Sequence, residues 1–174
     1  MKNTRNLILT ALMIAIGLIL PPIVRLIPNG GVLFSPMHIP ALLAGLCIGP
    51  VSGIVTGIVC PLLNNALFGM PMGSTLIGMC VELPVYGFIS GILMRALRNY
   101  VKNDTARVYI ALIVAMLAGR IAGGLMQGLV LGAKNYSIAI WASSYLIGTA
   151  PAIVIHLILL PAIYFALRKA KLVA

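Results

Sequence analysis

The chain has 174 residues, of which 61% are hydrophobic and only 8% are charged, with a mean hydropathy of +1.13. Soluble domains are about 45–50% apolar and about 25% charged, so this composition excludes a soluble enzyme and predicts a protein surrounded by lipid. At about 20 residues per span, the length allows six or seven membrane helices and leaves no room for a separate nucleotide-binding domain.

The first apolar segment follows two basic residues, Lys2 and Arg5, and in this respect looks like a signal peptide. Pro21 and Pro22 stand where a small-residue cleavage site would be needed, so we expect the segment to be retained as the first helix. Five further apolar segments follow, separated by Gly-, Pro- and Asn-containing stretches. The sequence therefore predicts a single all-α transmembrane domain over 1–174, a compact bundle with helices at about 7–24, 36–48, 51–67, 74–97, 108–131 and 140–167. A soluble connector is expected over 99–107, a loop over 134–136, and kinks in the last helix at Pro151 and Pro161.

Basic residues at the ends of these segments indicate the orientation of the bundle. With six spans, both termini lie on one side, and nine of the twelve Lys and Arg residues fall there. Arg25 and Lys134 lie on the opposite side, and Arg120 lies within a span. The positive-inside rule then predicts that both termini are cytoplasmic. The net charge of +10 is accordingly interpreted as membrane anchoring and orientation, with no nucleic-acid partner.

Polar side chains within membrane spans cost free energy unless they are paired or hydrated, so each is a candidate for function. At 1.5 Å per residue, Glu82 lies about 12 Å below the outer start of its helix, while Arg120 and His156 are near mid-membrane. Most of the set lies in the outer half, which predicts a pocket open to the exterior. The predicted substrate-binding residues are His38, Asn64, Asn65, Glu82, Tyr86, Arg120, Gln127, Trp141, Tyr145 and His156.

Each of these residues also has a structural interpretation. Glu82 and Arg120 could neutralise one another across two helices, and His156 could be a hydrogen-bonded packing residue. Asn64 and Asn65 could mark only a helix end. Trp141 and Tyr145 suit the membrane interface as well as the stacking of a flat ligand. The sequence contains no HExxH, GxSxG or Walker motif and no metal-ligand spacing, so it predicts neither an enzyme nor a cofactor or metal site.

Small residues recur at four-residue spacing, which permits close approach of helices. For most of the glycines, packing within the bundle is a sufficient explanation. Ala11 and Ala15 on the first helix are different, because their face could contact a partner protein.

Together these features resemble the substrate-binding S components of energy-coupling factor transporters. The Ala11/Ala15 stripe, the basic N-terminus and the long first outer loop contribute to the resemblance. So do the runs at 35–45 (SPMHIPALLAG), 61–65 (PLLNN), 68–71 (FGMP) and 119–123 (GRIAG). The resemblance covers essentially the whole chain.

The resemblance implies a vitamin-binding subunit in a prokaryotic cytoplasmic membrane. Such a subunit docks through its Ala-xxx-Ala face on a membrane coupling subunit, which carries two cytoplasmic ATPase subunits. The substrate would be a water-soluble vitamin or a vitamin precursor. Few aromatic residues lie near the predicted pocket, which argues against a flavin. Arg25, Arg120 and Lys134 could meet a carboxylate, which favours pantothenate; a neutral pocket with Glu82 and Arg120 paired would instead suit pyridoxine or hydroxymethylpyrimidine.

The rival interpretation is a small proton-coupled secondary transporter in which Glu82 or His156 titrates. Dual-topology exporters of that kind have little charge bias between their two faces, whereas the basic residues of this chain are strongly segregated. Uptake by the chain alone that stops with a protonophore but not with ATP depletion would favour the rival.

Overall fold

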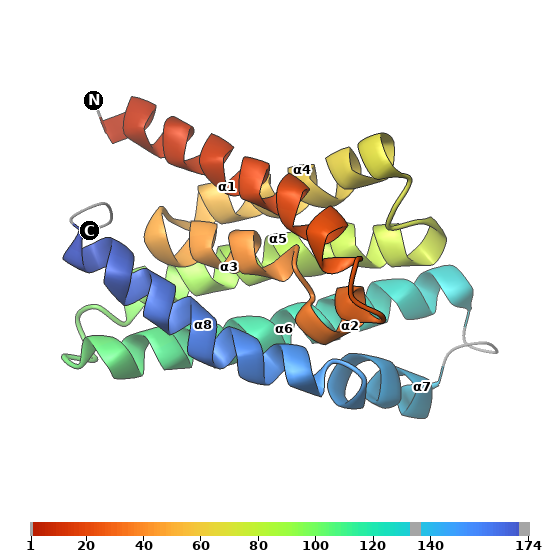
Figure 1. The fold of residues 1–174 in the computed structure, drawn as a ribbon. Coiled ribbons are helices and arrows are strands. Elements are labelled where there is room, and N and C mark those ends of the chain that lie inside the picture. The colour runs from red at the N-terminus through yellow and green to blue at the C-terminus, as the bar shows by residue number, and fades with distance from the viewer. Residues whose placement is uncertain (1, 133–136, 171–174) are drawn as a thin grey trace.

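The computed structural model describes residues 2–132 and 137–170, and every regular element in those ranges is helical (Figure 1). Residues 1, 133–136 and 171–174, including the loop predicted over 134–136, lie outside the described residues. In chain order the elements are α1 (Lys2–Val24), α2 (Gly30–Phe34), α3 (His38–Cys47), α4 (Pro50–Phe68), α5 (Gly73–Ala96), α6 (Asp104–Leu131), α7 (Ile138–Ala142), the π-helical turn η1 (Ser143–Ile147) and α8 (Ala150–Lys169).

Within the described residues, six segments are long and apolar enough to cross a membrane, which confirms the predicted all-α membrane class. Five are single helices, and the second span, Gly30–Cys47, combines α2 and α3. At 1.5 Å per residue the ten residues of α3 cover only about 15 Å, so this helix is too short to cross the membrane alone.

The first helix begins at Lys2 instead of about residue 7, and the second span begins at Gly30 instead of about residue 36. Two other boundaries differ from the sequence prediction for local chemical reasons. α6 begins at Asp104, four residues early, because the side chain of Asn103 accepts hydrogen bonds from the backbone N–H of Thr105 (2.9 Å) and of Ala106 (3.4 Å). The predicted sixth helix is divided into α7, η1 and α8 by a turn at Gly148 and Thr149. Pro151 lies in the first turn of α8, where its missing N–H costs nothing, so it starts a helix instead of kinking one.

The short helix α3 forms the centre of the bundle. It packs against α1, α4, α5 and α8, and from Pro40 to Leu46 all its side chains are buried. Figure 1 shows α3 enclosed between α1 and α4 on one side and α8 on the other, with α5 behind it. A helix that is apolar on every face can contact either lipid or protein, and α3 is enclosed by protein.

The absence of side chains at glycines lets α5 cross α4 with the backbones in contact. A Cβ added at Gly53 would lie 2.5 Å from backbone atoms of Gly87, and one added at Gly45 of α3 would lie 2.3 Å from the Gly87 carbonyl oxygen. These glycines therefore serve packing within the bundle, as the sequence analysis expected.

The two ends of the bundle differ in chemistry. The start of α1, the α5–α6 connection and the end of α8 lie together at one end, which we call the basic end (Figure 1). α2 and the α4–α5 connection lie at the opposite end, which we call the loop end.

Because basic residues are retained on the cytoplasmic side, we expect a reporter inserted at 101–102 or fused after residue 174 to be cytoplasmic. A reporter inserted beside Asn29 should be external. Paired alkaline phosphatase and fluorescent-protein fusions measure both outcomes, and alkaline phosphatase activity at 101–102 would contradict the orientation.

Candidate functional site

Four of the predicted residues meet in the interior as a group that we call the buried cluster: His38, Glu82, Tyr86 and His156. Two groups donate to Oε1 of Glu82. One is the Tyr86 hydroxyl, and the other is His38 Nε2, which lies 3.4 Å away. The His38 ring lies 5.2 Å from that of Tyr86 and 6.0 Å from that of His156, centroid to centroid. All four side chains are buried, so the network exchanges few hydrogen bonds with water.

The elements place this cluster through simple spacing. Glu82 and Tyr86 are four residues apart and therefore share one face of α5. His38 opens α3, and His156 lies within α8. His156 Nε2 is 3.1 Å from the Phe34 carbonyl oxygen, and since a carbonyl only accepts, Nε2 carries the proton.

Two glycines of α6 make room for the α5 face of the cluster. A Cβ at Gly119 would lie 2.2 Å from the Tyr86 ring, and one at Gly123 would lie 2.8 Å from Cβ of Glu82. The Gly119-Arg-Ile-Ala-Gly123 run noted in the sequence thus has a physical role, since larger residues would push α6 away from the carboxylate.

The Glu82–Arg120 ion pair, which the sequence left open as one alternative, is not formed between these two residues in the structure. Arg120 is only 2% exposed. Its guanidinium donates to the carbonyl of Tyr145 and to Oγ1 of Thr149. Glu82 instead takes its donors from the buried cluster. The Tyr145 carbonyl also accepts from Oγ1 of Thr149 (2.7 Å), so these three residues form one network beside the break between η1 and α8, and sequence spacing alone did not reveal it.

A second group of predicted residues joins α6 to α7 and η1. The Trp141 indole donates to the Arg120 carbonyl (3.2 Å), and the Tyr145 hydroxyl donates to Gln127 Oε1 (2.8 Å). These contacts hold the segment before α8 against α6. π-helical turns such as η1 occur frequently at functional sites.

Asn64 and Asn65 have separate local roles. Asn64 is fully buried and donates to the carbonyls of Gly17 and Cys60, both at 2.9 Å, which ties α4 to α1. Asn65 donates to the Pro71 carbonyl at 2.6 Å and so shapes the α4–α5 connection.

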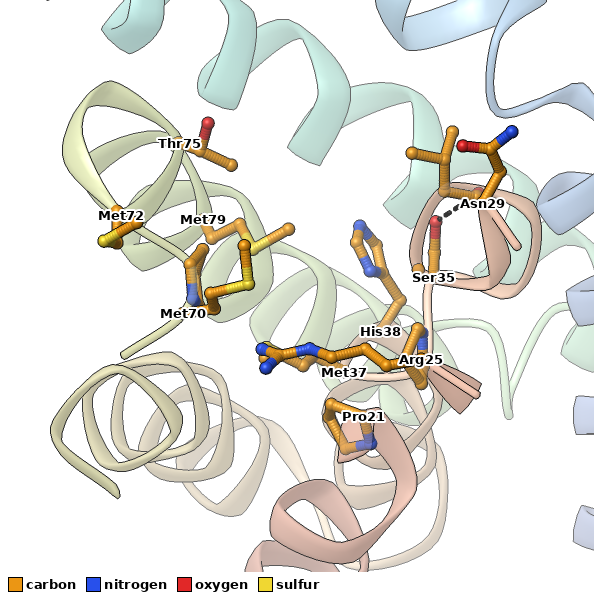
Figure 2. A pocket seen from close by; sticks show the side chains of 14 residues that line it. Pro21, Arg25, Asn29, Ser35, Met37, His38, Met70, Met72, Thr75 and Met79 are labelled. Carbon is orange, nitrogen blue, oxygen red and sulfur yellow. Dashed lines mark hydrogen bonds between the residues drawn. The ribbon is translucent and has the colours of Figure 1, made fainter. Parts of the chain in front are cut away.

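A cavity of about 450 Å³ opens at the loop end, and we call it the loop cavity (Figure 2). Small-molecule sites usually measure about 300–1,000 Å³. Figure 2 shows three methionines gathered on one side and Ser35 with Asn29 on the other, with Arg25 and His38 between them. The lining residues are Pro21, Arg25, Asn29, Gly31, Val32, Ser35, Pro36, Met37, His38, Met70, Pro71, Met72, Thr75 and Met79.

His38 is the one predicted substrate-binding residue that lines this cavity. Its Nδ1 atom is buried without a hydrogen-bond partner, while its Nε2 atom reaches Glu82. A buried nitrogen without a partner costs free energy, so a ligand group that satisfied it would gain affinity. The other nine predicted residues are not among those that line the cavity.

Sequence reasoning missed most of the lining because it searched for polar residues inside spans. Methionines 37, 70, 72 and 79 are apolar and carried no such signal, and Asn29, Ser35 and Thr75 lie in loops or helix ends. The depth of the polar residues had predicted a pocket toward this end of the bundle, but it did not indicate which side chains would line it. Among the described residues, no group of three or more His, Cys, Asp or Glu side chains could hold a metal ion.

Six apolar spans in the described residues define a multi-pass membrane protein, and a cavity of small-molecule size at the loop end is its candidate ligand site. The family model described as "ECF transporter, substrate-specific component" matches residues 5–173, nearly the whole chain, and the chain therefore belongs to this family. Its members recognise the transported small molecule within an energy-coupling transporter and are not enzymes. No curated protein and no solved structure matches the chain.

Gly124 offers a direct test of the α6–α7 contact, because an added Cβ would lie 2.1 Å from Nε1 of Trp141. We expect Gly124→Ala to displace the indole and to lower stability by about 1–3 kcal/mol, as overpacking does. Trp141 is the only tryptophan, so its fluorescence maximum should shift together with the unfolding temperature.

Gly31→Ala serves as the matched control, since a Cβ there meets nothing within 4 Å. The control should keep both the emission maximum and the unfolding temperature. An unchanged spectrum in Gly124→Ala would contradict the described packing of Trp141.

Proposed function

We propose that this chain is the substrate-binding subunit of a transporter for uptake of a water-soluble vitamin or vitamin precursor, bound in the loop cavity. The observation that carries the proposal is the cavity itself, about 450 Å³ in volume and mainly apolar, with one guanidinium in its wall. ATP hydrolysis would come from two cytoplasmic ATPase subunits through a membrane coupling subunit. The positive-inside prediction supports uptake, because it places the loop cavity on the exterior.

The lining favours an organic acid with a short aliphatic body, and pantothenate is the vitamin that fits this description best. Arg25 would pair with its carboxylate through a charge-assisted hydrogen bond. The methionines of α5 and of the α4–α5 connection would contact the branched methyl groups. Ser35, Thr75 and His38 Nδ1 are available to its hydroxyl and amide groups.

Pyridoxine and hydroxymethylpyrimidine are the next candidates, because both are small neutral alcohols. They were favoured on the condition that Glu82 and Arg120 neutralise one another in the pocket. The two residues have other partners and neither lines the loop cavity, so that argument no longer applies. Arg25 remains in the wall without a carboxylate among the other lining residues, which favours an acidic substrate.

Arg25→Gln should weaken pantothenate binding about 10- to 100-fold, because a hydrogen bond to a charged group contributes about 1.5–3 kcal/mol. Isothermal titration of the detergent-purified chain measures this change. Arg98→Gln removes an arginine at the basic end and should leave the affinity unchanged. Mass spectrometry of the co-purifying ligand provides an independent result. Recovery of pyridoxine or hydroxymethylpyrimidine, with no effect of Arg25→Gln, would overturn the acid-binding assignment.

The coupling partner is proposed to dock on α1. Ala11 and Ala15 are exposed on this helix, whereas Met13 and Gly17 face the bundle. A small-residue stripe that faces outward does not serve packing within this chain. It would permit the close approach of a helix from another subunit.

Ala11→Trp and Ala15→Trp should block transport and co-purification with the coupling subunit while ligand affinity stays within about twofold, because distant sites behave nearly independently. Ala162→Trp is the matched control, since Ala162 is also exposed but lies on α8. The control should retain transport. If ligand affinity fell in proportion to transport in the α1 variants, the docking assignment would be incorrect.

A further inference from the structure

A second cavity, of about 290 Å³, lies at the basic end, and we call it the basic cavity. Its wall combines the ends of α3, α5 and α8 with the beginning of α6. Four arginines line it: Arg95, Arg98, Arg107 and Arg168. At the floor the backbones of α4 and α5 touch, since a Cβ at Gly91 would lie 2.5 Å from the Pro50 nitrogen.

The charges in this cavity are far from balanced. The chain has two acidic residues, and Glu82 belongs to the buried cluster, so only Asp104 is available here. Its carboxylate accepts from the guanidinium groups of Arg107 and Arg168. In the described part of the chain, no hydrogen bond or ion pair joins the Arg95 or Arg98 side chain to another residue. One carboxylate therefore faces four cations.

Arg107 provides a separate indication that the basic cavity binds an anion. Its side chain is only 11% exposed, and its Nε atom is buried without a hydrogen-bond partner. Buried donors without partners are rare because each forfeits its hydration. An anion in the basic cavity would supply both the missing acceptor and the missing negative charge.

The position of the cavity identifies the source of that anion. Arg95 and Arg168 lie in the last turns of membrane helices, and Arg107 lies in the first turn of another, at the depth of lipid headgroups. One turn deeper, Ile92 and Ile110 expose apolar side chains at the level of acyl chains. Basic pockets between membrane helices on the cytoplasmic side are typical sites for anionic headgroups, and guanidinium groups match phosphate oxygens in geometry.

We propose that the basic cavity binds the phosphodiester headgroup of an anionic phospholipid. Arg95 and Arg98 contact the phosphate, and the acyl chains lie along α5 and α6. Asp104 holds Arg107 and Arg168 in place, so that these two guanidinium groups are oriented before the lipid arrives. This site is separate from the proposed vitamin site at the other end of the bundle.

The test uses the full chain purified in a neutral detergent, with affinities for phosphatidylglycerol, cardiolipin and phosphatidylcholine measured by native mass spectrometry. The double variant Arg95→Gln, Arg98→Gln should bind phosphatidylglycerol about 25-fold more weakly, since each basic residue near an anionic headgroup contributes about a factor of five. The control Lys102→Gln, Lys169→Gln removes the same charge from the same end, but neither residue lines the cavity. It should lose less than about threefold, because screening weakens contributions from charges outside the site.

Circular dichroism and thermal unfolding without added lipid check that both double variants fold. If the arginine variant does not fold, Arg98→Gln alone should still lose about fivefold. Equal losses in the control, or phosphatidylcholine binding as tightly as phosphatidylglycerol, would overturn the proposal. Millimolar inorganic phosphate should not displace the lipid; if it does so while the lipid alone binds weakly, the ligand is a free phosphate and the lipid assignment fails.

Discussion

The arrangement of this protein depends on the contact between the backbones of α5 and its neighbours. At Gly87 the α5 backbone touches α4 at Gly53 and α3 at Gly45, and near Gly91 it touches the start of α4. In a bilayer there is little hydrophobic drive to bring helices together, so close packing of this kind has to hold them. α5 also carries Met79 toward the loop cavity, Glu82 and Tyr86 in the interior, and Arg95 at the basic end. Fixing one helix therefore positions residues of the loop cavity, the buried cluster and the basic cavity together.

The sequence predicted the architecture well, because the membrane imposes a simple physical rule. Apolar runs of sufficient length have few alternatives to helices in lipid, so the spans could be located from composition and turn residues. The boundaries were harder to predict where a single side chain decides them, as Asn103 does for α6. The break before α8 was missed because Pro151 was interpreted as a kink within a longer helix, whereas it lies in the first turn of a new one.

The candidate site was predictable only in part, because polar residues stand out in an apolar span whereas apolar lining residues do not. Rare polar residues in apolar spans identified the buried cluster, and four of them do meet in space. Opposite charge was a poor guide to pairing, because Arg120 donates instead to the Tyr145 carbonyl and the Thr149 hydroxyl beside a helix break. Half of the residues that line the loop cavity are methionine or proline, which carry no functional signal in a hydrophobic sequence. The depth of the polar residues indicated the end of the bundle at which the cavity lies, but not its composition.

The methionine wall of the loop cavity has a consequence for selectivity under the proposed function. Thioether side chains are unbranched and polarizable, so they adapt to ligands of different outline, unlike the branched side chains of a rigid pocket. Discrimination would then depend on Arg25 and the few polar atoms around it, which read charge and hydrogen bonding but not bulk. A synthetic antimetabolite that kept the acid group and altered the aliphatic body would enter by the same route as the nutrient, and the uptake system would serve as a point of entry for growth inhibitors.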